Sequence, residues 1–266
     1  MGPGMTRALV FDSGVGGLTI ADEIRRAAPD WIVDYAADSG FFPYGVKTDE
    51  ELRARLPGLC AALVNIAKPD VLVVACNTAS TLSLADIRAR VKIPVVGTVP
   101  EIKPAAEQTK TGVIGILATP GTVRRAYLDD LERQFAADRH VIRRGSAGLV
   151  DMAERAVRGQ PIDQEQVDYA VKPLFDGPEG AKIDIVVLAC THFPLIRDAI
   201  QKACPPGVRL IDTGEPVARQ ALRVAPKTDH PQGKAVAYVT GGAANRAAMQ
   251  PAFARFGYVT IEVVDL

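Results

Sequence analysis

Two cysteines of this chain occupy matching places in two similar stretches of sequence. Residues 71–80 read VLVVACNTAS, and residues 185–194 read IVVLACTHFP. In each stretch, an aliphatic run typical of a buried strand ends in Ala-Cys, at Cys76 and Cys190, and a hydroxyl or amide side chain follows. A thiol can give and take a proton, and its thiolate is a base and nucleophile. The repetition favours a chemical role for this pair over the ordinary role of a buried cysteine as a small core residue.

Further polar side chains cluster around these positions in the sequence. Asp12 and Ser13 end the first apolar run and precede Gly-Val-Gly-Gly at 14–17. His192 follows Cys190 by two positions, and a histidine titrates near neutral pH, so we interpret it as functional rather than structural. Asp12 and Ser13 could instead cap the next helix, and both roles can coexist. The glycines fit neither phosphate-loop pattern, but their amides could approach a small anion such as a carboxylate or phosphate.

The other two cysteines are interpreted as structural. Cys60 lies in the apolar stripe of a predicted helix, and Cys204 precedes two prolines with no polar partner nearby in the sequence. Four cysteines are too few in a chain of this size for a disulfide scaffold, so all are expected to be thiols. No pair has the CxxC spacing of zinc sites, and we predict no metal.

The elements that must position these residues alternate between strand and helix. Short β-branched runs separated by longer segments of helical periodicity predict an α/β fold, with parallel sheets covered by helices on both faces. The predicted strands are 8–11, 32–36, 71–75, 95–97, 113–117, 141–143 and 185–188. The predicted helices are 18–27, 50–66, 79–90, 123–135, 149–157, 164–175 and 196–202.

The order of elements begins again near residue 113, which predicts two similar α/β domains. Residues 8–19 correspond loosely to 113–124, as 71–80 do to 185–194. The expected domains are 1–98 with 209–266, and 99–208, because the strand-like runs near 210, 235–240 and 259–264 have no third copy to join. Ligands bind at the carboxyl ends of parallel strands, so the active site is expected in the interdomain cleft. The turn-rich segment 41–45 is expected to be a surface loop, although Tyr44 and Gly45 could cover a pocket.

Composition limits the classes of function. The 266 residues include 31 Lys+Arg and 31 Asp+Glu, and this neutrality argues against nucleic acid or an anionic membrane as the main partner. No apolar run approaches the roughly 18 residues of a membrane span. The first seven residues lack the apolar stretch of a signal peptide, so we expect a soluble cytoplasmic protein.

At this level of detail the sequence resembles the glutamate racemases of the aspartate/glutamate racemase superfamily. The matching segments are FDSGVGGLT (11–19), PYG (43–45), ACNTAS (75–80), VVGTVPEIKPA (95–105), LATPGTV (117–123) and ACTHFPL (189–195). Two segments depart from the family pattern. Residues 37–39 read ADS where GDT is more usual, and 145–154 lack a common Cys-Pro, which leaves any acidic helper of the bases unassigned.

The resemblance implies a role for each matching residue. Cys76 would act on D-glutamate and Cys190 on L-glutamate, with Asp12 and His192 assisting the thiols. Substrate-contacting positions would be Asp12, Ser13, Tyr44, Gly45, Asn77, Thr78, Thr191 and His192, with Thr122 as a further contact. The resemblance also implies D-glutamate supply for peptidoglycan, glutamate as the small-molecule partner, and a homodimer.

Racemisation removes the Cα proton on one face and returns one on the other, so it needs two acid–base groups that face each other. No signature of a pyridoxal phosphate enzyme is present, and we predict no cofactor, with hydrogen bonds and dipoles stabilising the carbanion. Two alternatives stay open: a racemase of aspartate or a hydantoin, and a bilobal amino-acid-binding protein without chemistry.

Overall fold

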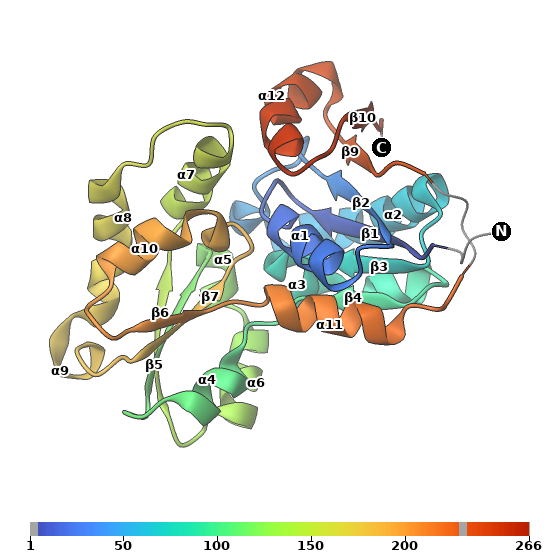
Figure 1. Ribbon diagram of the computed structural model, residues 1–266. Coiled ribbons are helices and arrows are strands. Elements are labelled where there is room, and N and C mark those ends of the chain that lie inside the picture. The colour runs from blue at the N-terminus through green and yellow to red at the C-terminus, as the bar shows by residue number, and fades with distance from the viewer. Residues whose placement is uncertain (1–4, 229–232, 266) are drawn as a thin grey trace. The chain divides into compact units, whose positions relative to one another are not determined.

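The computed structural model describes residues 5–228 and 233–265 of the chain (Figure 1). Residues 1–4, on which part of the signal-peptide argument rests, lie outside the described residues. The chain divides into two compact units, one formed by 1–98 with 214–266 and the other by 99–213. Within the described residues, no helix is both long and apolar enough to span a membrane.

The first unit is built on a six-stranded sheet in which all strand pairs are parallel. Its strands, in spatial order, are β10 (Thr260–Val263), β9 (Val236–Val239), β2 (Ile32–Ala37), β1 (Arg7–Asp12), β3 (Val71–Val74) and β4 (Val95–Gly97). β1 and β3 are buried along nearly their whole length. Leu9 and Phe11 of β1 pack in one hydrophobic cluster with leucines of the helix at Asp49–Ala67. Because side chains alternate along a strand, the residues between them face the opposite side of the sheet.

Helices cover this sheet on both faces. The longest helix is well defined by its sequence, because Thr48 and Glu51 form a reciprocal capping box and Leu52, Leu56 and Leu63 face the core. Two helix pairs pack side by side, α1 (Leu18–Ala27) with α11 (Gly214–Val224) and α2 (Asp49–Ala67) with α3 (Asn77–Arg90). The helices of this unit are α1 (Leu18–Ala27), α2 (Asp49–Ala67), α3 (Asn77–Arg90), α11 (Gly214–Val224) and α12 (Gly242–Arg255), with a 3₁₀ turn η1 (Tyr44–Val46).

The second unit is built on a smaller parallel sheet. Its four strands, in spatial order, are β6 (His140–Gly145), β5 (Val113–Ala118), β7 (Ile185–Ala189) and β8 (Arg209–Ile211). Ile114 and Ile116 pack with Ile102 and Leu128 on one face, while Gly115 leaves room for Leu174 on the other. The helical elements are α4 (Ile102–Gln108), α5 (Pro120–Val123), α6 (Ala126–Phe135), α7 (Gly148–Val157), α8 (Gln164–Val171), η2 (Lys172–Phe175), α9 (Gly177–Gly180), η3 (Phe193–Ile196) and α10 (Arg197–Ala203).

The two sheets repeat one topology, as the sequence predicts. In the first, β1 lies between β2 and β3, and β4 follows β3; in the second, β5 lies between β6 and β7, and β8 follows β7. The strands that precede Cys76 and Cys190, β3 and β7, are therefore equivalent. The prediction of two similar α/β domains with parallel sheets and flanking helices is confirmed.

Some element boundaries differ from those expected. The strand near 210 pairs with β7 and not with the first sheet, so residues 209–213 belong to the second unit and only the later tail strands join the first. The helix expected at 123–135 is two helices, α5 and α6. The helix expected at 164–175 becomes a 3₁₀ turn before Pro173, since proline lacks the N–H that an α-helix needs.

The interpretation of residues 41–45 as a surface loop is wrong for the side chain of Tyr44. Tyr44 is 1% exposed, and only its neighbours are half-exposed. Its hydroxyl donates to the buried carboxylate of Asp38 at 2.5 Å, which explains why an aromatic side chain in a turn is drawn inside.

Candidate active site

Cys76 lies at the carboxyl edge of the first sheet, where β1 and β3 end together. Phe11 pairs with Val74, and the amide of Ala75 donates to the Phe11 carbonyl at 2.8 Å, which continues the pairing up to the cysteine. Cys76 is the N-cap of α3 and is 6% exposed. Its sulfur lies 3.9 Å from the hydroxyl of Ser13. The N-terminus of α3 favours negative charge at this position.

Backbone amides of the glycine-rich loop after β1 donate hydrogen bonds to the carboxylate of Asp12. The amide of Ser13 donates to Asp12 Oδ1 at 2.6 Å, and the amide of Gly17 donates to Oδ2 at 2.5 Å. A Cβ on Gly17 would lie only 2.8 Å from that of Ala75, so glycine lets the loop pass this close to the strand end. The anion held by these loop amides is thus the chain's own Asp12, beside Ser13 and Cys76.

Asn77 has hydrogen-bonding capacity that the described protein atoms leave unused. It is 3% exposed, and among the residues described neither its amide nitrogen nor its amide oxygen has a hydrogen-bond partner. A buried amide is usually hydrogen-bonded in a folded protein, so Asn77, directly after Cys76, is a candidate donor and acceptor at this strand end. Thr78, the next residue of α3, is also buried.

Cys190 lies at the equivalent place in the second unit, directly after β7, and is 5% exposed. Its sulfur is 3.9 Å from Nδ1 of His192, whose Nε2 is 2.9 Å from Oε1 of Glu154. Burial alone would lower the pKa of His192, but hydrogen bonds with Cys190 and Glu154 outweigh burial and raise this pKa well above its ordinary value. His192 thus lies between the sulfur of Cys190 and the buried carboxylate of Glu154.

Hydroxyl groups line the same edge of the second sheet. Ala118 of β5 pairs with Ala189 of β7, so Thr119 and Cys190 follow neighbouring strand ends. Thr119 caps α5 and donates its hydroxyl hydrogen to the hydroxyl of the buried Thr122 at 3.0 Å. Thr191, between Cys190 and His192, is also buried.

Tyr44 is held by a network centred on Asp38, which follows β2 at the edge where Asp12 ends β1. The fully buried carboxylate of Asp38 accepts from Tyr44, from Thr240 after β9 at 2.6 Å, and twice from Arg55 of α2 at 2.7 Å. Burial and the neighbouring Asp38 charge raise the pKa of Tyr44 well above its ordinary value, so the phenol stays protonated as a donor. Gly45 follows in the same 3₁₀ turn and is half-buried.

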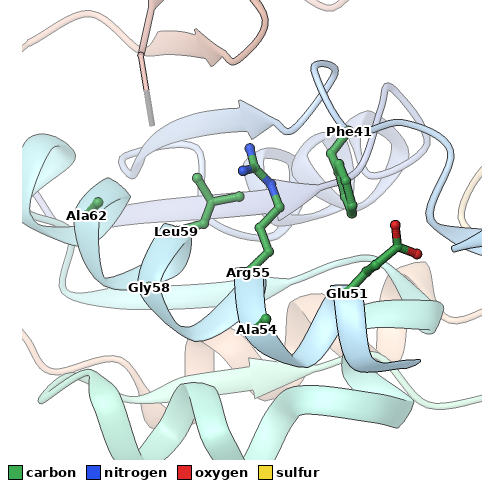
Figure 2. A pocket seen from close by; sticks show the side chains of 7 residues that line it. All are labelled: Phe41, Glu51, Ala54, Arg55, Gly58, Leu59 and Ala62. Atoms are coloured by element: carbon green, nitrogen blue, oxygen red, sulfur yellow. The ribbon is translucent and has the colours of Figure 1, made fainter. Parts of the chain in front are cut away.

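A pocket of about 540 Å³ lies against α2, and Figure 2 shows the side chains that line it. Arg55, Leu59 and Phe41 line it, and the Arg55 guanidinium that holds Asp38 also lies over the Phe41 ring, 5.3 Å from its centre. A second pocket of about 650 Å³ lies beside the start of α7, with Ser146 and Tyr169 among its lining residues. Neither pocket is lined by a predicted site residue.

Two buried carboxylates of this site were missed by the sequence analysis. Glu154 contacts His192, and its signal in the sequence was a carboxylate within the apolar stripe of α7 formed by Val150, Ala153 and Val157. Asp38 was noticed only as part of a departure from the family pattern. Its signal was an acidic residue directly after a buried strand, much as Asp12 is the last residue of β1.

The remaining cysteines stay outside both groups of polar residues. Cys60 is buried in the core beside α2, and burial raises its pKa, with a further contribution from Asp38. Cys204 is half-buried and its thiol donates to the Ile200 carbonyl. All four cysteines are free thiols, and the described part of the chain contains no group of three or more His, Cys, Asp or Glu side chains that could hold a metal ion.

The comparisons with known proteins agree with one another. The profile of the Asp/Glu/hydantoin racemases matches residues 18–221. The chain is 50% identical to the glutamate racemase of Sphingopyxis alaskensis over 229 residues, which cover 86% of this chain and 84% of that protein. The chain belongs to the glutamate racemase family. As a member of this family it is an amino-acid racemase, which is an isomerase.

Other glutamate racemases are similar along nearly the whole chain. The protein of Agrobacterium fabrum is 44% identical, with 88% of this chain and 87% of that protein covered. The crystal structure of the Escherichia coli glutamate racemase, in complex with L-glutamate and the activator UDP-MurNAc-Ala, has a TM-score of 0.92 at 37% identity, with 98% of each chain covered. The racemase fold therefore extends across both units.

Proposed function

We propose that this protein interconverts L-glutamate and D-glutamate by proton transfer between two thiols. Cys190 removes the Cα proton of L-glutamate while Cys76 delivers one to the opposite face, and the roles reverse for D-glutamate. The observation that carries the proposal is the duplication: equivalent strands of two equivalent units each end in a buried cysteine with its own polar partner. One sulfur must be a thiolate and the other a thiol at the start of each turnover.

Each sulfur has neighbours that can stabilise its thiolate form, which the proposed proton exchange requires. Negative charge on Cys76 is favoured by the start of α3, and negative charge on Cys190 by His192 when its imidazole is protonated. Asp12, near Ser13 and Cys76, assists the first thiol, and Glu154 holds His192 beside the second. These groups act on protonation of the sulfurs and do not replace them as bases.

Binding groups on both units would receive the two substrate carboxylates. The unused amide of Asn77 is the strongest candidate donor, and Ser13, Thr78, Thr191 and Thr122 add hydroxyls. Tyr44 and Gly45 contribute from the turn after β2. Because racemisation passes through a carbanion, these donors also stabilise the charge that develops on the α-carboxylate, and we propose that no cofactor or metal takes part.

The direct test is incubation of pure, chelator-treated protein with L-glutamate, followed by chiral chromatography. We expect D-glutamate to accumulate until the two enantiomers are equal. Racemisation of aspartate or a hydantoin in place of glutamate would favour the first alternative. Tight glutamate binding with unchanged chirality would favour a non-catalytic binding protein.

Isotope exchange tests the use of two bases. In deuterated water, the enantiomer being formed should carry deuterium early, because its proton comes from a thiol that has exchanged with solvent. The remaining starting enantiomer should stay protonated. Equal early labelling of both enantiomers would indicate a single exchanging base and would contradict the pairing of Cys76 with Cys190.

The cellular role and assembly follow from the family resemblance. We propose that the protein supplies D-glutamate for peptidoglycan in the cytoplasm, which is a compartment that suits its four free thiols. We also propose a homodimer. Sedimentation at several protein concentrations tests the dimer, and growth of a depleted strain with and without added D-glutamate tests the role.

A further inference from the structure

The contacts around Cys190 extend beyond Glu154 to an arginine. Oε1 of Glu154 faces His192, and Oε2 accepts from Nη2 of Arg158 at 2.6 Å. The Glu154 side chain is 4% exposed and that of Arg158 is 29% exposed. The two oxygens of one buried carboxylate thus contact two different basic side chains, one beside the reactive sulfur and one toward the surface.

The contact of Arg158 with Glu154 affects how Glu154 is oriented toward His192. A carboxylate rotates easily about its last bond, and nothing in the carboxylate itself selects which oxygen faces the histidine. A guanidinium on Oε2 fixes the carboxylate plane through a charge-assisted hydrogen bond. This leaves Oε1 directed at Nε2 of His192, so that Nδ1 is directed at Cys190.

We propose that Arg158 is a positioning residue for the Cys190 half of the site, acting through Glu154 and His192 without touching substrate. The inference rests on the proposed racemase mechanism and adds to it the C-cap residue of α7, four positions after the buried carboxylate. Partners that orient a catalytic histidine or carboxylate from behind commonly affect rate more than binding.

The structural alternative is that Arg158 only stabilises its helix. Arg158 and Glu154 are four residues apart, and such pairs contribute modestly to helix stability. The same helix offers a matched control, because Arg155 pairs with Asp151 at the same spacing and 3.1 Å, with both side chains substantially exposed. A purely structural role for Arg158 predicts a loss of stability without a selective loss of kcat. A positioning role predicts a loss of kcat for Arg158 and none for Arg155.

The experiment compares racemisation by wild type, Arg158→Gln, Arg158→Lys and Arg155→Gln, with circular dichroism and thermal unfolding to confirm folding. We expect Arg158→Gln to lower kcat about 10- to 100-fold with KM within about twofold. Arg158→Lys should recover part of the loss, and Arg155→Gln should stay within about twofold of wild type. If Arg158→Gln does not fold, the comparison of Arg158→Lys with Arg155→Lys replaces it, and a loss of kcat in the former alone is expected.

A double-mutant cycle identifies the route of the effect. In a Glu154→Gln background, Arg158→Gln should reduce kcat less than threefold further, because its partner is already changed. Equal losses in both backgrounds, or equal losses for the two arginines, would overturn the positioning role while leaving the racemase function standing. Wild-type protein that does not racemise glutamate would instead overturn the proposed function, and this inference with it.

Discussion

At the scale of single residues, the two proposed bases have different neighbours. Cys76 is the N-cap of α3 and its sulfur lies 3.9 Å from the Ser13 hydroxyl, whereas the sulfur of Cys190 lies 3.9 Å from the imidazole of His192, which contacts the buried carboxylate of Glu154. A helix N-terminus favours negative charge nearby, and an imidazole can give and take a proton. The two cysteines therefore have chemically different neighbours on a shared topology.

Replacement of either base should nearly abolish activity, because each carries out one of two proton transfers that must both occur. We expect Cys76→Ala and Cys190→Ala to lower kcat/KM for glutamate by about 10²- to 10⁴-fold. Cys60→Ala and Cys204→Ala are the matched controls and should retain most activity. The choice of pair would be wrong if an outer cysteine proved essential and one of the inner two did not.

Thiol reactivity provides an independent test of the same assignment. Burial raises the pKa of Cys204 to about 11, so at pH 8 only about one molecule in a thousand carries this residue as a thiolate. Alkylation of Cys204 by iodoacetamide should therefore be slow and should rise about tenfold per pH unit up to pH 11.

Cys76 and Cys190 should be labelled earlier, and glutamate should protect them. Mass spectrometry of peptides from timed samples gives the order. Labelling of Cys204 ahead of both inner cysteines at pH 8 would contradict the prediction.

The sequence could predict the cysteines but not all of their partners. Cys76 and Cys190 were visible because each repeats with its strand, and His192 lies two positions from Cys190. Glu154 is 38 positions from His192, and its contact with that residue depends on how α7 packs against η3. A polar residue in an apolar stripe is visible in sequence, but the partner that justifies it is not.

At the scale of elements, the end of β2 is tied to three other segments. Asp38 holds Tyr44 of η1, Arg55 of α2 and Thr240 after β9 through one buried carboxylate. Where these elements lie was largely predictable, since strand and helix periodicity is local. Their connection was not, because Thr240 is 202 residues from Asp38. The same limitation explains the strand near 210, whose apolar pattern fits an edge of either sheet.

Loss of the Asp38 charge should weaken this connection. Asp38→Asn leaves the Arg55 guanidinium without its anion and should lower the free energy of unfolding by about 3 kcal/mol. It should also raise the KM for glutamate, because the one acceptor oxygen of asparagine cannot hold Tyr44, Thr240 and Arg55 as the two oxygens of Asp38 do.

The control for this change is Asp86→Asn. Asp86 pairs with Arg53, another arginine of α2, at 3.2 Å with both side chains about half exposed, so its loss should cost less than about 1 kcal/mol. Urea unfolding measures both variants. Equal destabilisation by the two substitutions would show that burial of Asp38 does not matter to the fold.

At the scale of the whole molecule, the duplicated topology provides the two equivalent strand ends that the proposed two-base mechanism needs. One parallel sheet presents its strand ends along a single edge, so it can readily place a base on one side of a substrate carbon. A second, equivalent sheet can place another base on the opposite side. The chemistry of racemisation needs this opposition, and the repeat visible in the sequence supplies two copies of the same strand end.

The two-base mechanism makes a geometric prediction for the complex with substrate. For proton transfer, each sulfur must come within about 3 to 3.5 Å of Cα from opposite faces, so the sulfurs of Cys76 and Cys190 should lie about 6 to 8 Å apart with glutamate between them. The two thiols should face each other without bonding, with Asp12 on the Cys76 side and His192 on the Cys190 side. A crystal structure with bound glutamate measures this distance directly. If the sulfurs in that complex faced separate surfaces, or only one approached Cα, proton transfer between two thiols could not be the mechanism, because a single base cannot reach both faces of a planar carbanion held in one orientation.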